Sequence, residues 1–403
     1  MKRTCLTVIG IFLFLFYGFG QTPRADTTVY KPRKLTFDEA SLVSSYYTQN
    51  GDHSAIQGGT GNEHVTDLAN GIELKWVGWD AKQRKNSLTA GMGIDHHTAA
   101  SQAYISKTGA SRRTDGLRLY PSLDWVRENE KKGSSIGAGV YYSNEFNYQS
   151  VGFNAGVTQR TKNNGEFGLK LSAYLDQVKL IFPSEFEPAG AYTPGRNGDE
   201  HHPDYGSSGR QTYTASFSFS QVINTRLQAS LLLDVVEQHG YLGLPFHRVY
   251  FTNGVDSVEK LPSNRFKLPV GLRVNYFPGD NIILRGYYRY YTDSWGLHSH
   301  TASLETTIKL TPFFSVTPFY RYYTQKAADY FAPYEAHVVG DGFYTSNYAL
   351  AGFSSHFFGG GIRLAPPKGI FDSHLKMLEI RYGHYTQTTD LVSDVISLNL
   401  QFK

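Results

Sequence analysis

The sequence has almost no cysteine, and this absence limits how the folded chain can be held together. Its single cysteine, Cys5, precedes an apolar run at residues 6–19. A charged head before this run and small residues after it form the pattern of a secretory signal peptide. We therefore predict a signal peptide over residues 1–20, which leaves an exported chain without cysteine that disulfides cannot stabilise.

An excess of charge of one sign and long apolar segments are missing as well. The chain has 39 lysines and arginines against 35 acidic residues, a formal net charge of +4. A balance this close to neutral argues against nucleic acid as a partner. No apolar run after residue 20 is long enough for a transmembrane helix. Nucleophile elbows, phosphate-binding glycine loops and helical zinc motifs are also absent, so we expect no enzyme.

Aromatic residues and glycine are abundant instead, with 29 Tyr, 26 Phe and 40 Gly. A chain that is exported, free of cysteine and rich in these residues has the composition of an outer-membrane β-barrel. Segments that alternate strictly between apolar and polar residues recur, as at residues 72–76, 272–276 and 396–402. This period indicates strands with two unlike faces, of which a barrel turns the apolar one to lipid.

The connections between these strands are of two kinds. Short turns, such as residues 81–86 and 161–166, alternate with long segments at residues 98–115, 183–209, 239–263 and 326–343. This asymmetry is typical of outer-membrane barrels, which have short periplasmic turns and long extracellular loops. We predict an all-β fold, a transmembrane antiparallel barrel of about 16 strands, in the outer membrane. It covers residues 41–403, after a short periplasmic segment at residues 21–40.

A tyrosine repeat, YYTQ and its variants YYSN, YYTD and HYTQ, ends the strands that run towards the cell exterior. Because these strand ends share one height, we expect their tyrosines to form an outer aromatic girdle in contact with lipid headgroups. The alternative is that tyrosine simply favours strands. The predicted girdle comprises Tyr46, Tyr47, Tyr141, Tyr142, Tyr290, Tyr291, Tyr322, Tyr323 and Tyr385.

Basic residues dominate the polar phase of the predicted strands. An excess of fixed cations inside a wall of low dielectric constant favours anionic solutes. The alternative is that these cations pair with acidic residues and only fill the interior. The predicted basic ladder of the lumen comprises Arg273, Arg285, Arg289, Arg321, Arg363 and Arg381.

Aspartate and histidine residues gather at one predicted rim of the barrel, around the stretch GIDHHTAAS at residues 93–101. Carboxylates suit calcium, whereas imidazoles suit zinc, copper or nickel. Adjacent strand residues face opposite sides, so His96 and His97 cannot easily bind one ion together. A hydrated polar mouth, a calcium site and a transition-metal site all stay open. The candidate ligands are Asp52, Glu63, Asp95, His96, His97 and Asp115.

The chain resembles a family of Bacteroidota outer-membrane proteins, the domain of unknown function 3570 family. The resemblance extends over nearly the whole exported chain and is carried by these stretches: SSYYTQNGDHSAIQGGTGNEHVTD (44–67), GIDHHTAAS (93–101), GASRRTDG (109–116) and YPSLDW (120–125). Members of the family look like barrels encoded near thioredoxin-like proteins and flavin-attaching enzymes. The resemblance therefore implies a link to extracytoplasmic redox or cofactor traffic, with a periplasmic redox protein or lipoprotein as partner.

These patterns together predict a porin-like barrel in contact with membrane lipid, a channel or passage component for small polar, anionic solutes. The rival hypothesis is a barrel that transports nothing and holds a periplasmic or surface partner, with a metal site at its outer rim.

Overall fold

The structure is a computed structural model that describes residues 30–97, 116–145, 147–186, 193–194, 200–201 and 205–403. The predicted signal peptide and the loop at residues 98–115 lie outside the described residues.

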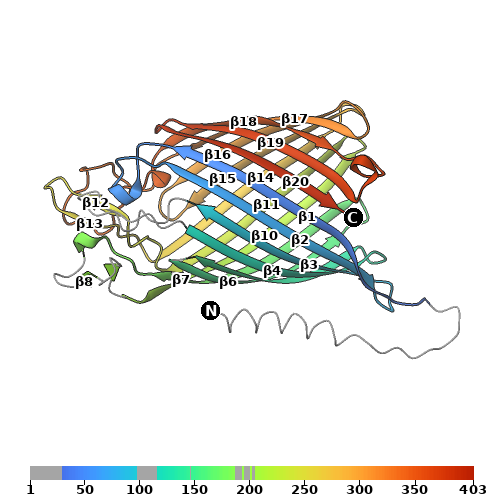
Figure 1. The fold of residues 1–403 in the computed structure, drawn as a ribbon, viewed down its shortest axis with the longest axis horizontal. Helices are drawn as coiled ribbons and strands as arrows, with labels where there is room; N and C mark the ends of the chain where they lie inside the picture. The colour runs from blue at the N-terminus through green and yellow to red at the C-terminus, as the bar shows by residue number, and fades with distance from the viewer. Residues whose placement is uncertain (1–29, 98–115, 146, 187–192, 195–199, 202–204) are drawn as a thin grey trace.

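Sixteen antiparallel strands close into a barrel (Figure 1), which confirms the predicted fold and strand number. In barrel order the strands are β1 (Arg33–Asn50), β2 (Val65–Trp79), β3 (Lys85–His97), β4 (Gly116–Asn129), β5 (Ser134–Glu145), β6 (Tyr148–Arg160), β7 (Gly165–Lys179), β10 (Ser207–Asn224), β11 (Leu227–Gly240), β14 (Asn264–Tyr276), β15 (Ile282–Asp293), β16 (His298–Lys309), β17 (Phe314–Gln325), β18 (Phe353–Leu364), β19 (Leu375–Gln387) and β20 (Leu391–Phe402).

The first and last strands close the wall. β1 pairs with β2 on one side and with β20 on the other, from Ala40 opposite Phe402 to Asn50 opposite Val392. The first strand begins at Arg33, earlier than the predicted start of the barrel at residue 41. A closed sheet has no free edge, so each backbone N–H and C=O group in the hydrocarbon layer finds a partner on a neighbouring strand.

Side chains alternate between an apolar outer face and a polar lumen along each strand. On β7, Leu171 is 53% exposed on the outside of the barrel. Lys170 and Tyr174 lie on the opposite phase and line a cavity of the lumen, so Ser172 between them faces the lumen too. The apolar residues on the outside of the closed sheet need lipid, which places the barrel in the outer membrane. Among the described residues no helix has the length and apolar character to cross a membrane.

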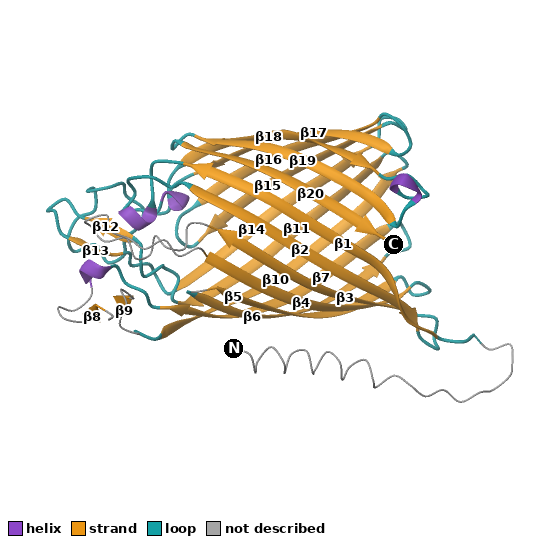
Figure 2. Cartoon of the chain, in the orientation of Figure 1, coloured by secondary structure: helices purple, strands orange, loops and turns teal. Residues whose placement is uncertain are grey.

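The two ends of the barrel differ as the sequence predicts. Short turns join the strands at one end, where Asp80 accepts backbone hydrogen bonds from Lys82 and Arg84. Long connections gather at the other end (Figure 2). They carry the small pairs β8 (Thr193–Pro194) with β9 (Glu200–His201) and β12 (Arg248–Tyr250) with β13 (Asp256–Val258).

The alternation on β7 can be tested with one arginine placed on either face. Leu171→Arg puts a cation into the hydrocarbon layer and should lower the free energy of unfolding by about 2–4 kcal/mol. Ser172→Arg, one residue away, puts the same group into the lumen and should cost much less. Urea unfolding of the barrel in lipid vesicles, followed by the gel shift of the folded form, measures both. Equal losses would contradict the assignment of the two faces.

Candidate functional site

The tyrosines of the predicted girdle divide into two sets. Tyr46 and Tyr142 are exposed on the outer face, and Tyr290 and Tyr322 contact the rings of outward histidines. The others occupy the opposite phase and face the lumen: Tyr47, Tyr141, Tyr291, Tyr323 and Tyr385. The prediction of a lipid-facing girdle is wrong for this second set, because adjacent residues of a strand point to opposite faces.

Four of these five lumen tyrosines support the residue two positions further on, which shares their face, whereas the hydroxyl of Tyr141 accepts a hydrogen bond from Arg118. The hydroxyls of the four donate hydrogen bonds in the pairs Tyr47–Gln49 at 2.7 Å, Tyr291–Asp293 at 2.7 Å, Tyr323–Gln325 at 2.5 Å and Tyr385–Gln387 at 2.6 Å. Two of the glutamines in turn donate to loop carbonyls, Gln49 to Glu63 and Gln325 to Ala349. The repeat thus anchors the outer loops to the wall.

The predicted basic ladder lies on the lumen phase of its strands, and only part of it is neutralised. Glu305 on β16 accepts hydrogen bonds from Arg285 on β15 and Arg381 on β19, each at 2.7 Å. Arg381 also lies 3.3 Å from Glu379. For these two arginines the structure supports the alternative that lumen cations pair with acids.

The rest of the ladder is different. Within the described part of the chain, no carboxylate lies within ion-pair distance of Arg273, Arg289, Arg321 or Arg363. Two of them rest on aromatic rings instead, Arg273 at 5.9 Å from the centre of Tyr287 and Arg321 at 4.8 Å from the centre of Phe357. These four arginines are unpaired cations on one side of the lumen wall, from β14 to β18, whereas described lumen carboxylates that also lack an ion-pair partner, such as Glu73 and Asp124, lie on β2 and β4.

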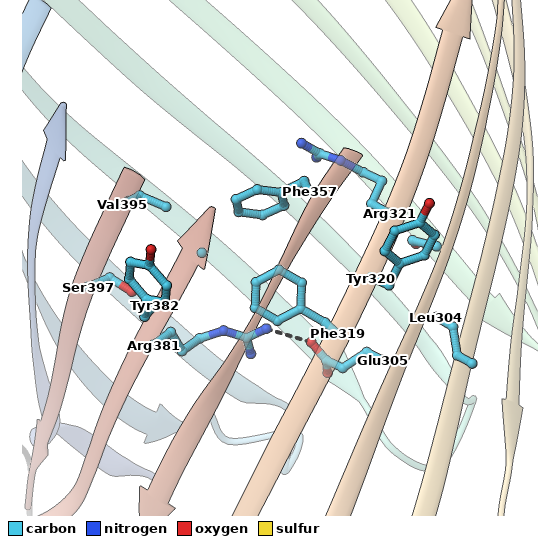
Figure 3. Close-up of a pocket in the computed structure, with 12 residues that line it drawn as sticks. Leu304, Glu305, Phe319, Tyr320, Arg321, Phe357, Arg381, Tyr382, Val395 and Ser397 are labelled. Atoms are coloured by element: carbon cyan, nitrogen blue, oxygen red, sulfur yellow. Dashed lines mark hydrogen bonds and ion pairs between the residues drawn. The ribbon is translucent and has the colours of Figure 1, made fainter. Parts of the chain in front are cut away.

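A cavity of about 280 Å³ is set into this wall between β16 and β20 (Figure 3). Its lining includes Arg321 and Arg381 of the ladder, together with two phenyl rings, Phe319 and Phe357. The sequence reasoning missed both phenylalanines. The signal was available, because Phe319 stands two residues before Arg321 and so shares its lumen phase.

The predicted metal ligands at the rim are not brought together. Asp95 accepts a hydrogen bond from Tyr120 at 2.7 Å and lies 4.0 Å from Nη1 of Arg118, so its carboxylate already serves the wall. His96 is exposed beside the outward residues Leu68 and Leu117. No three His, Cys, Asp or Glu residues that the structure describes are grouped to hold an ion. The side chain of His97 and all of Asp115 lie outside the description.

The loop carboxylates of the rim have a different environment. Burial raises the pKa of Glu63, against a smaller lowering effect of His53, and Asp52 adds to the rise. The rise is mainly an effect of desolvation, which disfavours the charged form of the carboxyl group.

Elemental analysis of the purified barrel tests the metal hypotheses at the rim. We expect no stoichiometric metal after extensive dialysis, because Arg118 already balances the charge of Asp95. A bound metal that Asp95→Asn abolishes would contradict this expectation and support a calcium-type site. A metal lost only in His96→Ala with His97→Ala would contradict it in favour of a transition-metal site.

The long loops form a roof over the outer end of the barrel, made of residues 51–64, 180–186, 241–263 and 326–352. Arg248 on β12 is 3% exposed and donates hydrogen bonds to Glu185 and to the carbonyl of Ile56. It thereby joins three of these loops. Ile56 also packs with Ile181 and Phe246 in a small apolar cluster.

Glu259 is the second centre of the roof. Its side chain is 2% exposed, lies 3.1 Å from Nδ1 of His247, and accepts hydrogen bonds from the Leu244 amide and the Thr345 hydroxyl. Burial alone would raise the pKa of Glu259, but the charge of His247 and these hydrogen bonds outweigh it and lower the pKa. The carboxylate therefore holds the loops at residues 241–263 and 326–352 together as an anion.

Below the roof lies a cavity of about 560 Å³, bounded by the loops above and the outer strand ends around it. Apolar loop side chains such as Leu244 and Phe246 line one side and wall arginines the other. The arginines are each paired with an aspartate: Arg118 with Asp95, Arg210 with Asp176, and Arg265 with Asp293. The outer entrance is therefore close to neutral, unlike the ladder further along the lumen.

Removal of the Glu259 charge should loosen the roof. Its stabilising effect is present above the ordinary carboxyl pKa of about 4.3 and is lost as the pH falls through the lowered pKa of the folded state. Glu259→Gln should remove about 2 kcal/mol of local stability at neutral pH. We expect faster amide exchange across residues 241–263 and 326–352, with wild type matching the variant only in acid. The exposed Glu335→Gln is the control, and equal exchange in both variants at neutral pH would contradict this role.

The closed sheet, the apolar outer face and the polar lumen define this protein as an outer-membrane β-barrel. The chain belongs to the family described as protein of unknown function (DUF3570), whose model matches residues 84–391. No curated protein matches the sequence.

Solved barrels resemble the chain at a coarse level. A bacterial polysaccharide outer membrane secretin has a TM-score of 0.45 and 9% identity, covering 90% of this chain and 98% of its own. A BenF-like porin from Pseudomonas fluorescens Pf-5 has a TM-score of 0.43 and 6% identity, covering 93% and 100%. OccK1 (OpdK) of Pseudomonas aeruginosa has a TM-score of 0.41 and 8% identity, covering 90% and 97%. Likeness at this level assigns no activity to the chain.

Proposed function

We propose that the barrel is a channel for small polar anions across the outer membrane. The observation that carries the proposal is a set of lumen arginines that have no carboxylate partner in the described part of the chain: Arg273, Arg289, Arg321 and Arg363. They lie on four strands of one side of the barrel, β14, β15, β17 and β18.

Unpaired guanidinium groups in this position act on any ion that enters the lumen. The wall around them has a low dielectric constant, so their field is focused into the water of the lumen and is weakly screened there. An anion gains favourable energy along the ladder, while a cation is repelled. Arginine keeps its charge at every physiological pH, so this preference would not depend on pH.

The roof encloses a cavity at the outer end of the proposed path. The cavity beneath it lies between the loops and the outer ends of the strands, and its arginines are balanced by aspartates. A solute would leave the bulk water at this cavity, and it would then meet the arginines without carboxylate partners deeper in the lumen. This proposal requires no catalytic step of the chain.

The second candidate is a barrel that transports nothing and holds a periplasmic or surface partner. The family resemblance favours it through the implied link to extracytoplasmic redox or cofactor traffic. The two candidates differ in one measurable property, because only the first requires an open, conducting lumen.

Conductance in planar lipid bilayers tests the proposal. In a gradient of potassium chloride, the wild-type reversal potential should have the sign of the chloride equilibrium potential. Arg289→Gln combined with Arg321→Gln should lower the ratio of anion to cation permeability by about two- to fivefold, because two unscreened charges leave the path.

The control removes one positive charge outside the lumen. Arg127 lies on the outer phase of β4, donates a hydrogen bond to Asn86 and lies 4.9 Å from the ring centre of Trp125. Arg127→Gln should leave the permeability ratio unchanged. A wild-type barrel that prefers cations, or a double variant with unaltered selectivity, would disprove the anion channel. A folded barrel without conductance would favour the scaffold.

A further inference from the structure

We infer that the lumen wall between β16 and β20 binds planar ring-containing monoanions, with an aromatic carboxylate as the simplest ligand. This inference rests on the proposed passage of anions, whose substrate class it narrows, but binding can be measured without conductance. The site consists of Phe319, Phe357 and Arg321, beside the occupied pair of Arg381 and Glu305 (Figure 3).

Two phenyl rings lie on the polar face of the wall. Phe319 and Phe357 lie on the lumen phase of β17 and β18, with ring centres 5.1 Å apart and planes tilted by 45°. The outer face needs apolar residues for lipid, and Phe358 serves there at 46% exposure. A hydrated lumen has no such need, and apolar area left in water costs free energy. A ligand that covers the rings recovers that cost.

The wall accommodates these rings at a glycine of the next strand, β19. A Cβ atom added to Gly383 would lie 2.5 Å from Cζ of Phe357 and 3.2 Å from Cζ of Phe319. Both rings therefore lie across neighbouring strands, over a position where a side chain would meet them. They lie along the wall and leave the cavity of about 280 Å³ open in front of them. Such a volume suits a small solute.

The charge around the two rings is distributed asymmetrically. At one side the guanidinium of Arg321 lies 4.8 Å from the centre of Phe357, and no carboxylate contacts it among the described residues. At the other side Arg381 lies 5.2 Å from the centre of Phe319, but Glu305 and Glu379 hold it. Of the two arginines beside the rings, only Arg321 therefore has no acidic partner among the residues that the structure describes. The site matches a ligand with one anionic group and one flat ring.

Arg321 and the two phenyl rings bind different parts of a ligand, and each contributes independently of the other. A carboxylate gains a charge-assisted hydrogen bond from Arg321 whether or not a ring is attached to it. A ring gains offset or edge-on contact with Phe319 and Phe357 that a puckered aliphatic ring of similar size cannot make. Benzoate should therefore bind better than cyclohexanecarboxylate, which has the charge without the flat ring, and better than benzamide, which has the ring without the charge.

Ligand-observed NMR titration of the intact barrel in detergent micelles tests the inference. We expect wild type to bind benzoate about fivefold more tightly than cyclohexanecarboxylate. Phe357→Leu keeps apolar volume but removes the ring and should abolish this preference. Arg321→Gln should weaken both acids about tenfold and leave benzamide unchanged.

Two control variants lie outside the proposed site. Phe358→Leu removes a phenyl ring from the lipid face of the same strand and should keep the benzoate preference. Arg127→Gln removes an arginine from the outer phase of β4 and should leave the affinity for both acids unchanged. The gel shift of the folded barrel shows that each variant folds. Equal affinity for the two acids in wild type, or equal losses in Phe357→Leu and Phe358→Leu, would overturn the inference.

The outcomes separate this site from the proposed function. A conducting, anion-selective barrel without benzoate preference keeps the channel and overturns the site. A barrel without conductance that binds benzoate through Phe357 supports the site and disproves the channel.

Discussion

The structure depends on the requirement that every backbone N–H and C=O group inside a membrane has a hydrogen-bond partner. The chain meets it by closing β1 onto β20, so that the sheet has no edge. Once the wall is closed, each residue faces either lipid or lumen. The chemistry of the protein is then decided by which residues fall on the inner phase, and by the loops that cover one end.

The inner face shows two ways of handling charge. At the entrance below the roof, arginines and aspartates pair, as Arg265 does with Asp293, and the field there is nearly balanced. Deeper in the wall, Arg321 rests on a phenyl ring with no acid in contact among the described residues. The roof itself is held by two buried ionic groups, Arg248 and Glu259, and by apolar clusters around Phe246 and Trp295. Lumen tyrosines join the two regions, as Tyr323 does through Gln325.

Much of the fold could be predicted from the sequence, because strand alternation and the two lengths of connection are local signals. The lumen placement of the arginines followed from the same period. The prediction for the tyrosine repeat was wrong because it assumed that tyrosines at the same height of the barrel face the same side of the wall. Tyr322 and Tyr323 point in opposite directions. Which arginines are paired could not be read from the sequence, since Glu305 meets Arg381 from a strand that is not its neighbour. The contacts of Arg248 and Glu259 likewise join loops far apart in the chain.

Alternate residues of β17 face the water inside the barrel and the lipid outside it, and Arg321 lies on the side that faces the water. Cys5 lies in the predicted signal peptide, so a cysteine introduced into the exported chain is its only thiol. The most direct measurement is labelling of Arg321→Cys and Tyr322→Cys, in barrels reconstituted into lipid vesicles, with a small anionic thiol reagent that cannot cross lipid. The account predicts rapid labelling at position 321 and almost none at position 322. Equal labelling at both positions, or labelling only at 322, would contradict it.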